Sequence, residues 1–196
     1  MPKRILLYAL RGALGFGLGG AIVLLAEYLV FSQTPIEEAV PFQFIFVAWF
    51  VAGAMGAIAL SWGSGLPVLG GAAGFGCGFV LTSFAVMFTT ISLQASAGPE
   101  YSWGATGCGT GFAVGGAIGA VATTRSLTGG ILGALTFGFT GAAWGPLLFW
   151  LSWYHGGALP EANHVPLAAV ILLFPFVMGG LLWGGALGLF SVEDES

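Results

Sequence analysis

The chain has 196 residues, of which 57% are hydrophobic and only 6% are charged. A soluble domain carries about 25% charged residues, so most of this surface is expected to face lipid. Eight acidic and four basic residues give a formal net charge of −4, which excludes the basic footprint of a nucleic-acid-binding protein. The 35 glycines follow no G-X-Y period, so collagen is excluded as well.

Six apolar runs follow one another along the chain, each with the roughly 20 residues that a helix needs to cross a bilayer core. The first continues past Arg11, which indicates an uncleaved helix instead of a signal peptide. Pro146 and Pro175 lie inside the last two runs and predict kinks there. The sequence therefore predicts a single all-α membrane domain (1–196) of six glycine-rich transmembrane helices. The runs are residues 5–31, 42–60, 68–91, 103–122, 127–151 and 167–190.

The charged residues predict the orientation of these helices. Six spans place both termini, the second loop and the fourth loop on one side of the membrane. The bases Lys3, Arg4 and Arg125 fall on that side, and Arg11 lies nearest to it. By the positive-inside rule, both termini are expected in the cytoplasm. The opposite loops carry acids, namely Glu37, Glu38, Glu100 and Glu161.

A motif of two glycines separated by two residues recurs at a spacing of 59 residues, and recurrence at a fixed spacing indicates an internal repeat. The motif begins at Gly12, Gly71 and Gly130, in the first helix of each hairpin. The second helix of each hairpin carries phenylalanine followed by a glycine three residues later, beginning at Phe50, Phe112 and Phe176. These echoes predict three repeated helical hairpins, residues 5–62, 66–122 and 127–190, around a pseudo-three-fold axis along the membrane normal. The axis is either a packed core or a path.

Glycines at four-residue spacing favour the packed core, because small residues let helix backbones approach closely in lipid. We expect these stripes to be helix-packing surfaces without a cofactor, although their grooves leave room for a bound lipid or a flat hydrophobic cofactor. The predicted packing residues are Gly70, Gly74 and Gly78 in the third helix, Gly107, Gly111, Gly115 and Gly119 in the fourth, and Gly180, Gly184 and Gly188 in the sixth.

Two charged residues of the first helix, Arg11 and Glu27, are candidate intramembrane groups. They are 16 positions apart, or about 24 Å along a helix, so a core of about 30 Å cannot lie wholly between them. A charge inside the core is costly and marks a functional candidate. Alternatively, Arg11 extends to the inner headgroups and Glu27 reaches the outer interface.

Other chemistry is sparse. His155, Glu161 and His164 share the last outer loop, but their spacing matches no zinc motif, so we predict no metal site. The spans contain no paired carboxylates and no hydrolase or nucleotide-binding motif, and we therefore predict that the protein is not an enzyme. Threonines at 82, 89, 90, 106, 110, 136 and 140 either line a hydroxyl-bearing path or bond to their own helices.

Two functions remain open at this point. The first is a non-catalytic structural or accessory subunit of a larger membrane complex, with lipid and other membrane-protein subunits as partners. It follows from uniformly apolar spans, small-residue faces and short loops. The alternative is a small carrier or channel for a small solute through the six-helix bundle. Membrane transport proteins keep ionisable groups inside the bundle, and this chain has at most two, so the first function is favoured.

Overall fold

The computed structural model describes residues 2–32, 43–62, 64–95, 101–154 and 165–193. These residues form α1 (Pro2–Ser32), α2 (Gln43–Ser61), α3 (Val68–Ala95), α4 (Tyr101–Thr124), α5 (Leu127–Tyr154) and α6 (Val165–Glu193). All six helices are long and apolar enough to cross a membrane, so the prediction of six spans is confirmed. Several helices continue a few residues past their apolar runs, because backbone hydrogen bonding persists where hydropathy has already fallen.

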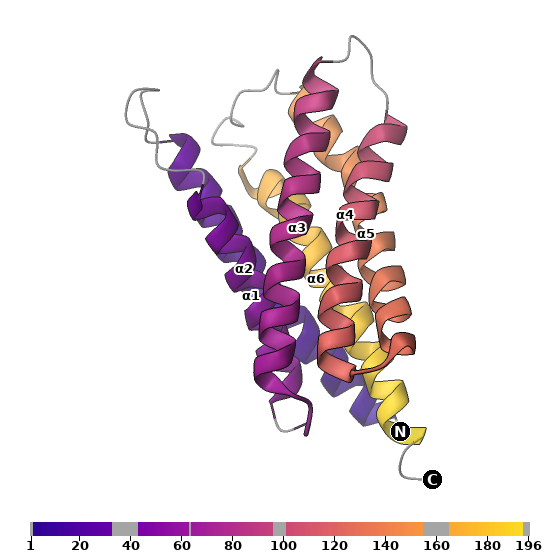
Figure 1. The fold of residues 1–196 in the computed structure, drawn as a ribbon. Helices are drawn as coiled ribbons and strands as arrows, with labels where there is room; N and C mark the ends of the chain where they lie inside the picture. The colour runs from indigo at the N-terminus through magenta and orange to yellow at the C-terminus, as the bar shows by residue number, and fades with distance from the viewer. Residues whose placement is uncertain (1, 33–42, 63, 96–100, 155–164, 194–196) are drawn as a thin grey trace.

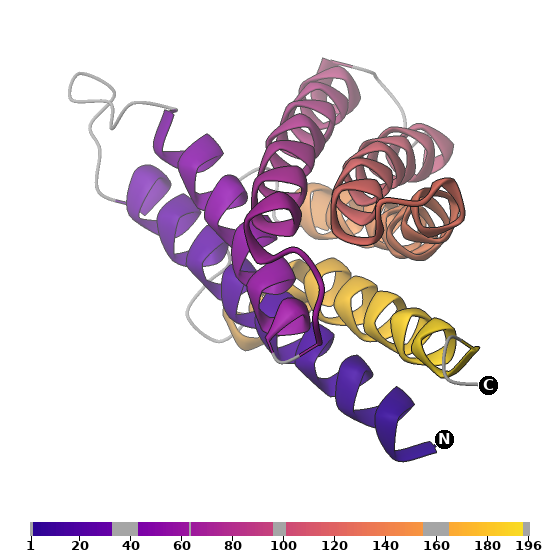
Figure 2. The ribbon, with the colours of Figure 1, turned by 60° about the horizontal axis from the view of Figure 1, so that its bottom comes forward.

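The six helices form a bundle in which the chain returns to its start. Each helix packs against the next one along the sequence, and α6 packs along α1 (Figures 1 and 2). The beginning of α1, the end of α6 and the turns that join α2 to α3 and α4 to α5 lie at the same end of the bundle (Figure 1). We call this the basic end, because Lys3, Arg4, Arg11 and Arg125 belong to these segments.

Both interior prolines lie within continuous helices. Pro146 is inside α5 and Pro175 is inside α6. The kinks expected at these two residues remain a prediction.

The turn between α4 and α5 is built on a residue in the left-handed region. Arg125 has a φ of 53°, and its N–H donates to the carbonyl of Val121 at 2.7 Å, which closes the last turn of α4. The next residue, Ser126, precedes α5, and its Oγ accepts from the N–H of Gly129 at 3.0 Å. A serine that bonds the third residue of a helix is an N-cap. The turn therefore consists of Arg125 and Ser126 alone, between the end of α4 at Thr124 and the start of α5 at Leu127.

This conformation predicts that Arg125→Gly stabilises the protein. An L side chain in the left-handed region costs roughly 1–2 kcal/mol, whereas glycine adopts it without that cost. We expect the free energy of unfolding in detergent micelles to rise by about 1 kcal/mol. Arg125→Ala is the matched control, because it removes the charge and keeps the strain. An equal gain in both variants would assign the effect to charge and contradict the prediction.

Candidate functional site

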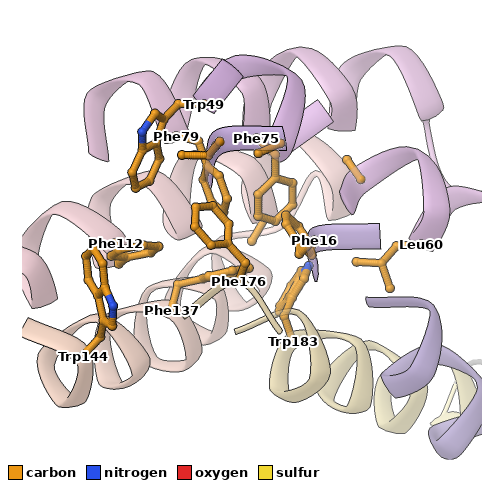
Figure 3. Packing of buried hydrophobic residues seen from close by; sticks show 14 of the residues in the cluster. Phe16, Trp49, Leu60, Phe75, Phe79, Phe112, Phe137, Trp144, Phe176 and Trp183 are labelled. Carbon is orange, nitrogen blue, oxygen red and sulfur yellow. The ribbon is translucent and has the colours of Figure 1, made fainter. Parts of the chain in front are cut away.

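The interior of the bundle is filled with aromatic rings. A first layer is formed by Phe16 of α1, Phe75 of α3 and Phe137 of α5, which have no exposed surface. Their ring centroids are 5.1 Å apart for Phe16 and Phe75, 5.2 Å for Phe16 and Phe137, and 5.7 Å for Phe75 and Phe137. These are ordinary distances for edge-to-face aromatic packing. The first, third and fifth helices thus meet through one ring each (Figure 3).

A second layer comes from the other three helices. Trp49 of α2, Phe112 of α4 and Phe176 of α6 have ring centroids 5.2–6.1 Å apart. Two of these, Phe112 and Phe176, belong to the repeated motif. In α2 the motif residue Phe50 is 39% exposed, and its neighbour Trp49 lies in the interior instead. The hairpin repeat therefore stays a prediction.

Phe79 of α3 joins the two layers. Its ring centroid lies 5.5–6.3 Å from the centroid of each of the six rings just described. It is fully buried and lies among the labelled rings in Figure 3. Seven aromatic side chains therefore pack against one another inside the bundle.

Glycines of neighbouring helices provide the space for these rings. A Cβ added to Gly56 would meet the ring of Phe16, one on Gly119 would meet Phe75, and one on Gly141 would lie 2.8 Å from Phe112 Cβ. Gly20 has the same relation to Phe176, as do Gly116 and Gly179 to Phe137. At these six positions a ring of one helix occupies the space beside a glycine of another.

Some glycines of the predicted stripes face the main chain of a neighbouring helix, and others face its side chains. In the α3–α4 interface, a Cβ on Gly78 would meet the main chain of Gly115, and the reverse also holds. Where α1 crosses α6, Gly180 has the same relation to the main chain of Gly12. The remaining stripe residues also have neighbours within contact distance: Gly74 meets Ala122, Gly107 meets Thr89, Gly111 meets Ala85, Gly119 meets Phe75, Gly184 meets Tyr8 and Gly188 meets Ile5. Gly70 is exposed, with Ala122 O 3.3 Å from its ideal Cβ.

The buried threonine hydroxyls bond to backbone carbonyls, whereas the buried hydroxyl of Ser61 has no hydrogen-bond partner among the described residues. Thr82 Oγ1 lies 3.0 Å from the carbonyl of Gly78 on its own helix and 2.9 Å from that of Gly111 on α4. Thr123 and Thr140 bond within their own helices, and so do Thr89 and Thr136. Bonding of this kind is the common role of threonine in an apolar helix. Thr106 and Thr110 are exposed on α4, and the side chain of Thr90 lies outside the described residues.

Arg11 binds the end of a neighbouring helix. Its Nη1 donates to the carbonyl oxygen of Trp62 at 2.7 Å, and Trp62 directly follows the last residue of α2. A cation at a helix C-terminus is favourable, since the terminal carbonyls carry partial negative charge. Arg11 thus reaches the basic end of the bundle.

Glu27 lies at the other end of α1 and faces inward. It is half-buried and is hydrogen-bonded to the side chain of Trp49. Only the indole N–H of Trp49 can donate in that pair. The indoles of Trp144 and Trp183 are also buried, yet neither has a hydrogen-bond partner in the described part of the chain. Trp49 thus connects Glu27 to the second layer of rings.

Metal chemistry finds no support in the described ranges. Among those residues, no group of three His, Cys, Asp or Glu side chains is close enough to hold a metal ion. The loop residues His155, Glu161 and His164 lie outside the described ranges. Within the described residues, the candidate functional site is therefore the pair of Glu27 and Trp49, which lies beside the aromatic interior.

The sequence matches no known protein family model, and no curated protein or solved structure is significantly similar to it.

Proposed function

We propose that this chain is a non-catalytic integral membrane protein that serves as a structural or accessory subunit of a larger membrane complex. The observation that carries the proposal is the ring-filled interior. Seven aromatic side chains occupy the region where a carrier or channel of this size would need a polar lining. A solute that crosses the bundle needs hydrogen-bonding groups or charges along its path. Six of the seven rings are phenylalanines, which offer neither, and the indole N–H of Trp49 is already bonded to Glu27.

The hydroxyls and the outer surface support the same role. Thr82, Thr123 and Thr140 are buried, and each is engaged with backbone carbonyls, so these hydroxyls are already used. Bulky apolar side chains cover the outside of the bundle. On α1 the exposed set comprises Leu6, Leu7, Leu10, Leu14, Leu18, Ile22 and Leu25. Such a surface fits contact with lipid and with the apolar helices of other subunits.

Orientation and symmetry belong to the proposal. All four Lys and Arg residues belong to segments near the basic end, which supports a cytoplasmic position for both termini. Two layers of three rings, one from α1, α3 and α5 and the other from α2, α4 and α6, support an arrangement of three repeated hairpins. The exposed Phe50 marks the hairpin that departs most from the other two.

Isolation from the native membrane tests the accessory role. The protein is extracted in a mild detergent and separated on a native gel, and co-migrating chains are identified by mass spectrometry. Other chains at a fixed ratio, reproduced in independent preparations, are the expected result. Migration as a monomer or small homo-oligomer would reject an accessory subunit. Solute uptake by liposomes that contain the purified protein would then be measured, because the alternative function, a small carrier or channel, requires it.

A further inference from the structure

Glu27 belongs to the apolar part of α1, residues Lys3–Glu27, that is long enough to cross a membrane. The guanidinium of Arg11 bonds to the carbonyl just beyond the end of α2, which places Arg11 at the basic end of the bundle. Glu27 is about 24 Å further along α1, whereas the hydrocarbon core is about 30 Å thick. Any tilt of α1 shortens that distance along the membrane normal. Since about 24 Å is less than about 30 Å, Glu27 lies inside the far edge of the core when the backbone of Arg11 lies at the near edge.

The Glu27 side chain is directed toward the interior of the bundle. Gly20 and Val23 lie on the same face of α1, seven and four residues earlier. A Cβ on Gly20 would lie 2.7 Å from the ring of Phe176 in α6, and Val23 is buried. The hydrogen-bond partner of Glu27 is Trp49, which is only 3% exposed. A carboxyl bonded to a buried indole is not extended toward the headgroups.

No cation from a Lys or Arg side chain is near enough to balance a charge on Glu27. The whole chain has four such residues, Lys3, Arg4, Arg11 and Arg125, and all belong to segments near the basic end. The helices packed against α1 add no ionisable group at this depth. The sequence of α2 contains none, and that of α6 contains only Glu193, at the basic end. The side chain of Tyr28 and the loop residues His155 and His164 lie outside the described part.

We propose that Glu27 and Trp49 form a proton-binding site in the half of the membrane away from the basic end. There Glu27 is held as the uncharged acid, and the indole N–H of Trp49 donates to its carbonyl oxygen. An unpaired carboxylate in an apolar interior is strongly disfavoured, and taking up one proton removes that charge. Loss of the proton would leave the charge facing Trp49, whose ring contacts Phe112 and Phe176, so the site couples protonation to packing of the second layer. This inference does not depend on the accessory role.

Infrared spectroscopy of the full-length protein in lipid at neutral pH tests the site. Glu27→Gln keeps the size of the side chain and removes the acid. We expect this variant to lose the C=O stretching band of a protonated carboxyl group and to keep the carboxylate bands unchanged. Glu193→Gln is the control, expected to leave the protonated-acid band intact. A loss of carboxylate intensity in Glu27→Gln would show that the unaltered protein carries a charge there and would overturn the proposal.

Two further measurements separate the roles of the two residues. Trp49→Phe removes the N–H donor and retains an aromatic ring, so the acid band is expected to move to higher frequency. An unchanged frequency would overturn the role assigned to Trp49. For an outcome independent of variant folding, the unaltered protein is treated with dicyclohexylcarbodiimide, which adds to protonated carboxyl groups in apolar surroundings. Peptide mapping is expected to find the adduct on Glu27, and an unmodified Glu27 would count against the site.

Discussion

Phe79→Ala is expected to lower the free energy of unfolding by about 3 kcal/mol. Truncating a buried phenylalanine in a water-surrounded protein costs about 3–5 kcal/mol, as the sum of a transfer contribution and a cavity contribution. In a bilayer the unfolded helices remain in lipid, so the transfer contribution is small. The cavity contribution remains, because the six surrounding rings lose their contacts with Phe79 together.

The measurement is reversible unfolding in mixed micelles, with Phe88→Ala as the matched control. Phe88 lies on the same helix and is 73% exposed, so lipid or detergent takes the place of its ring at little cost. We also expect Phe79→Leu to lose less stability than Phe79→Ala, since it leaves a smaller cavity. If Phe79→Ala were as stable as Phe88→Ala, the contacts between the two layers of rings could not be a main source of stability.

The number and order of the helices could be predicted from the sequence, whereas the inward face of each helix could not. In a water-soluble bundle, polar residues mark the exposed side of a helix, and their period identifies its buried side. Here both sides are apolar, because lipid replaces water. Trp49 and Phe50 are adjacent in α2 and equally suited to an apolar interior, and only the structure distinguishes the buried tryptophan from the exposed phenylalanine.

Four of the buried phenylalanines share a local sequence pattern that partly indicates their inward position. Phe16, Phe75, Phe79 and Phe112 each directly follow a glycine. A glycine and a phenylalanine occur next to each other in the sequence where each helix both supplies a ring and leaves space for the ring of another helix. The pattern is not specific, since Phe139 also follows a glycine and is 71% exposed.

The two charged residues of α1 could be identified from the sequence, whereas the groups to which they bond could not. Glu27 and Arg11 were identified because charges are rare in apolar spans. The partner of Arg11 is the backbone carbonyl of Trp62, and a carbonyl occurs at every residue, so no sequence pattern indicates it. The partner of Glu27 is Trp49, 22 positions later on the next helix, and the pairing depends on how the two helices cross.

Gly184→Ala is expected to lower the free energy of unfolding by about 1–3 kcal/mol, the usual range for adding a methyl group to a filled interface. At this position α6 packs against the main chain of α1, and Figure 2 shows the two helices side by side. An added Cβ would overlap the carbonyl of Tyr8 and lie 3.1 Å from the Cα of Ala9. Those atoms belong to the main chain of α1, so they can yield only if the two helices move apart. Separation would also loosen the contact between Gly12 and Gly180, because Gly180 lies about one turn before Gly184 in α6.

Gly185→Ala is the control for this prediction, because it introduces the same methyl group at the next residue. There the nearest atom is the Cβ of Ala9, at 3.9 Å, which is an ordinary contact. Alanine is also the better helix former, so we expect stability equal to or slightly above that of the unaltered protein. Trimming the side chain with Tyr8→Ala is not expected to rescue Gly184→Ala, because the overlap is with the backbone. Rescue, or equal losses at positions 184 and 185, would mean that main-chain contact does not set the distance between α1 and α6.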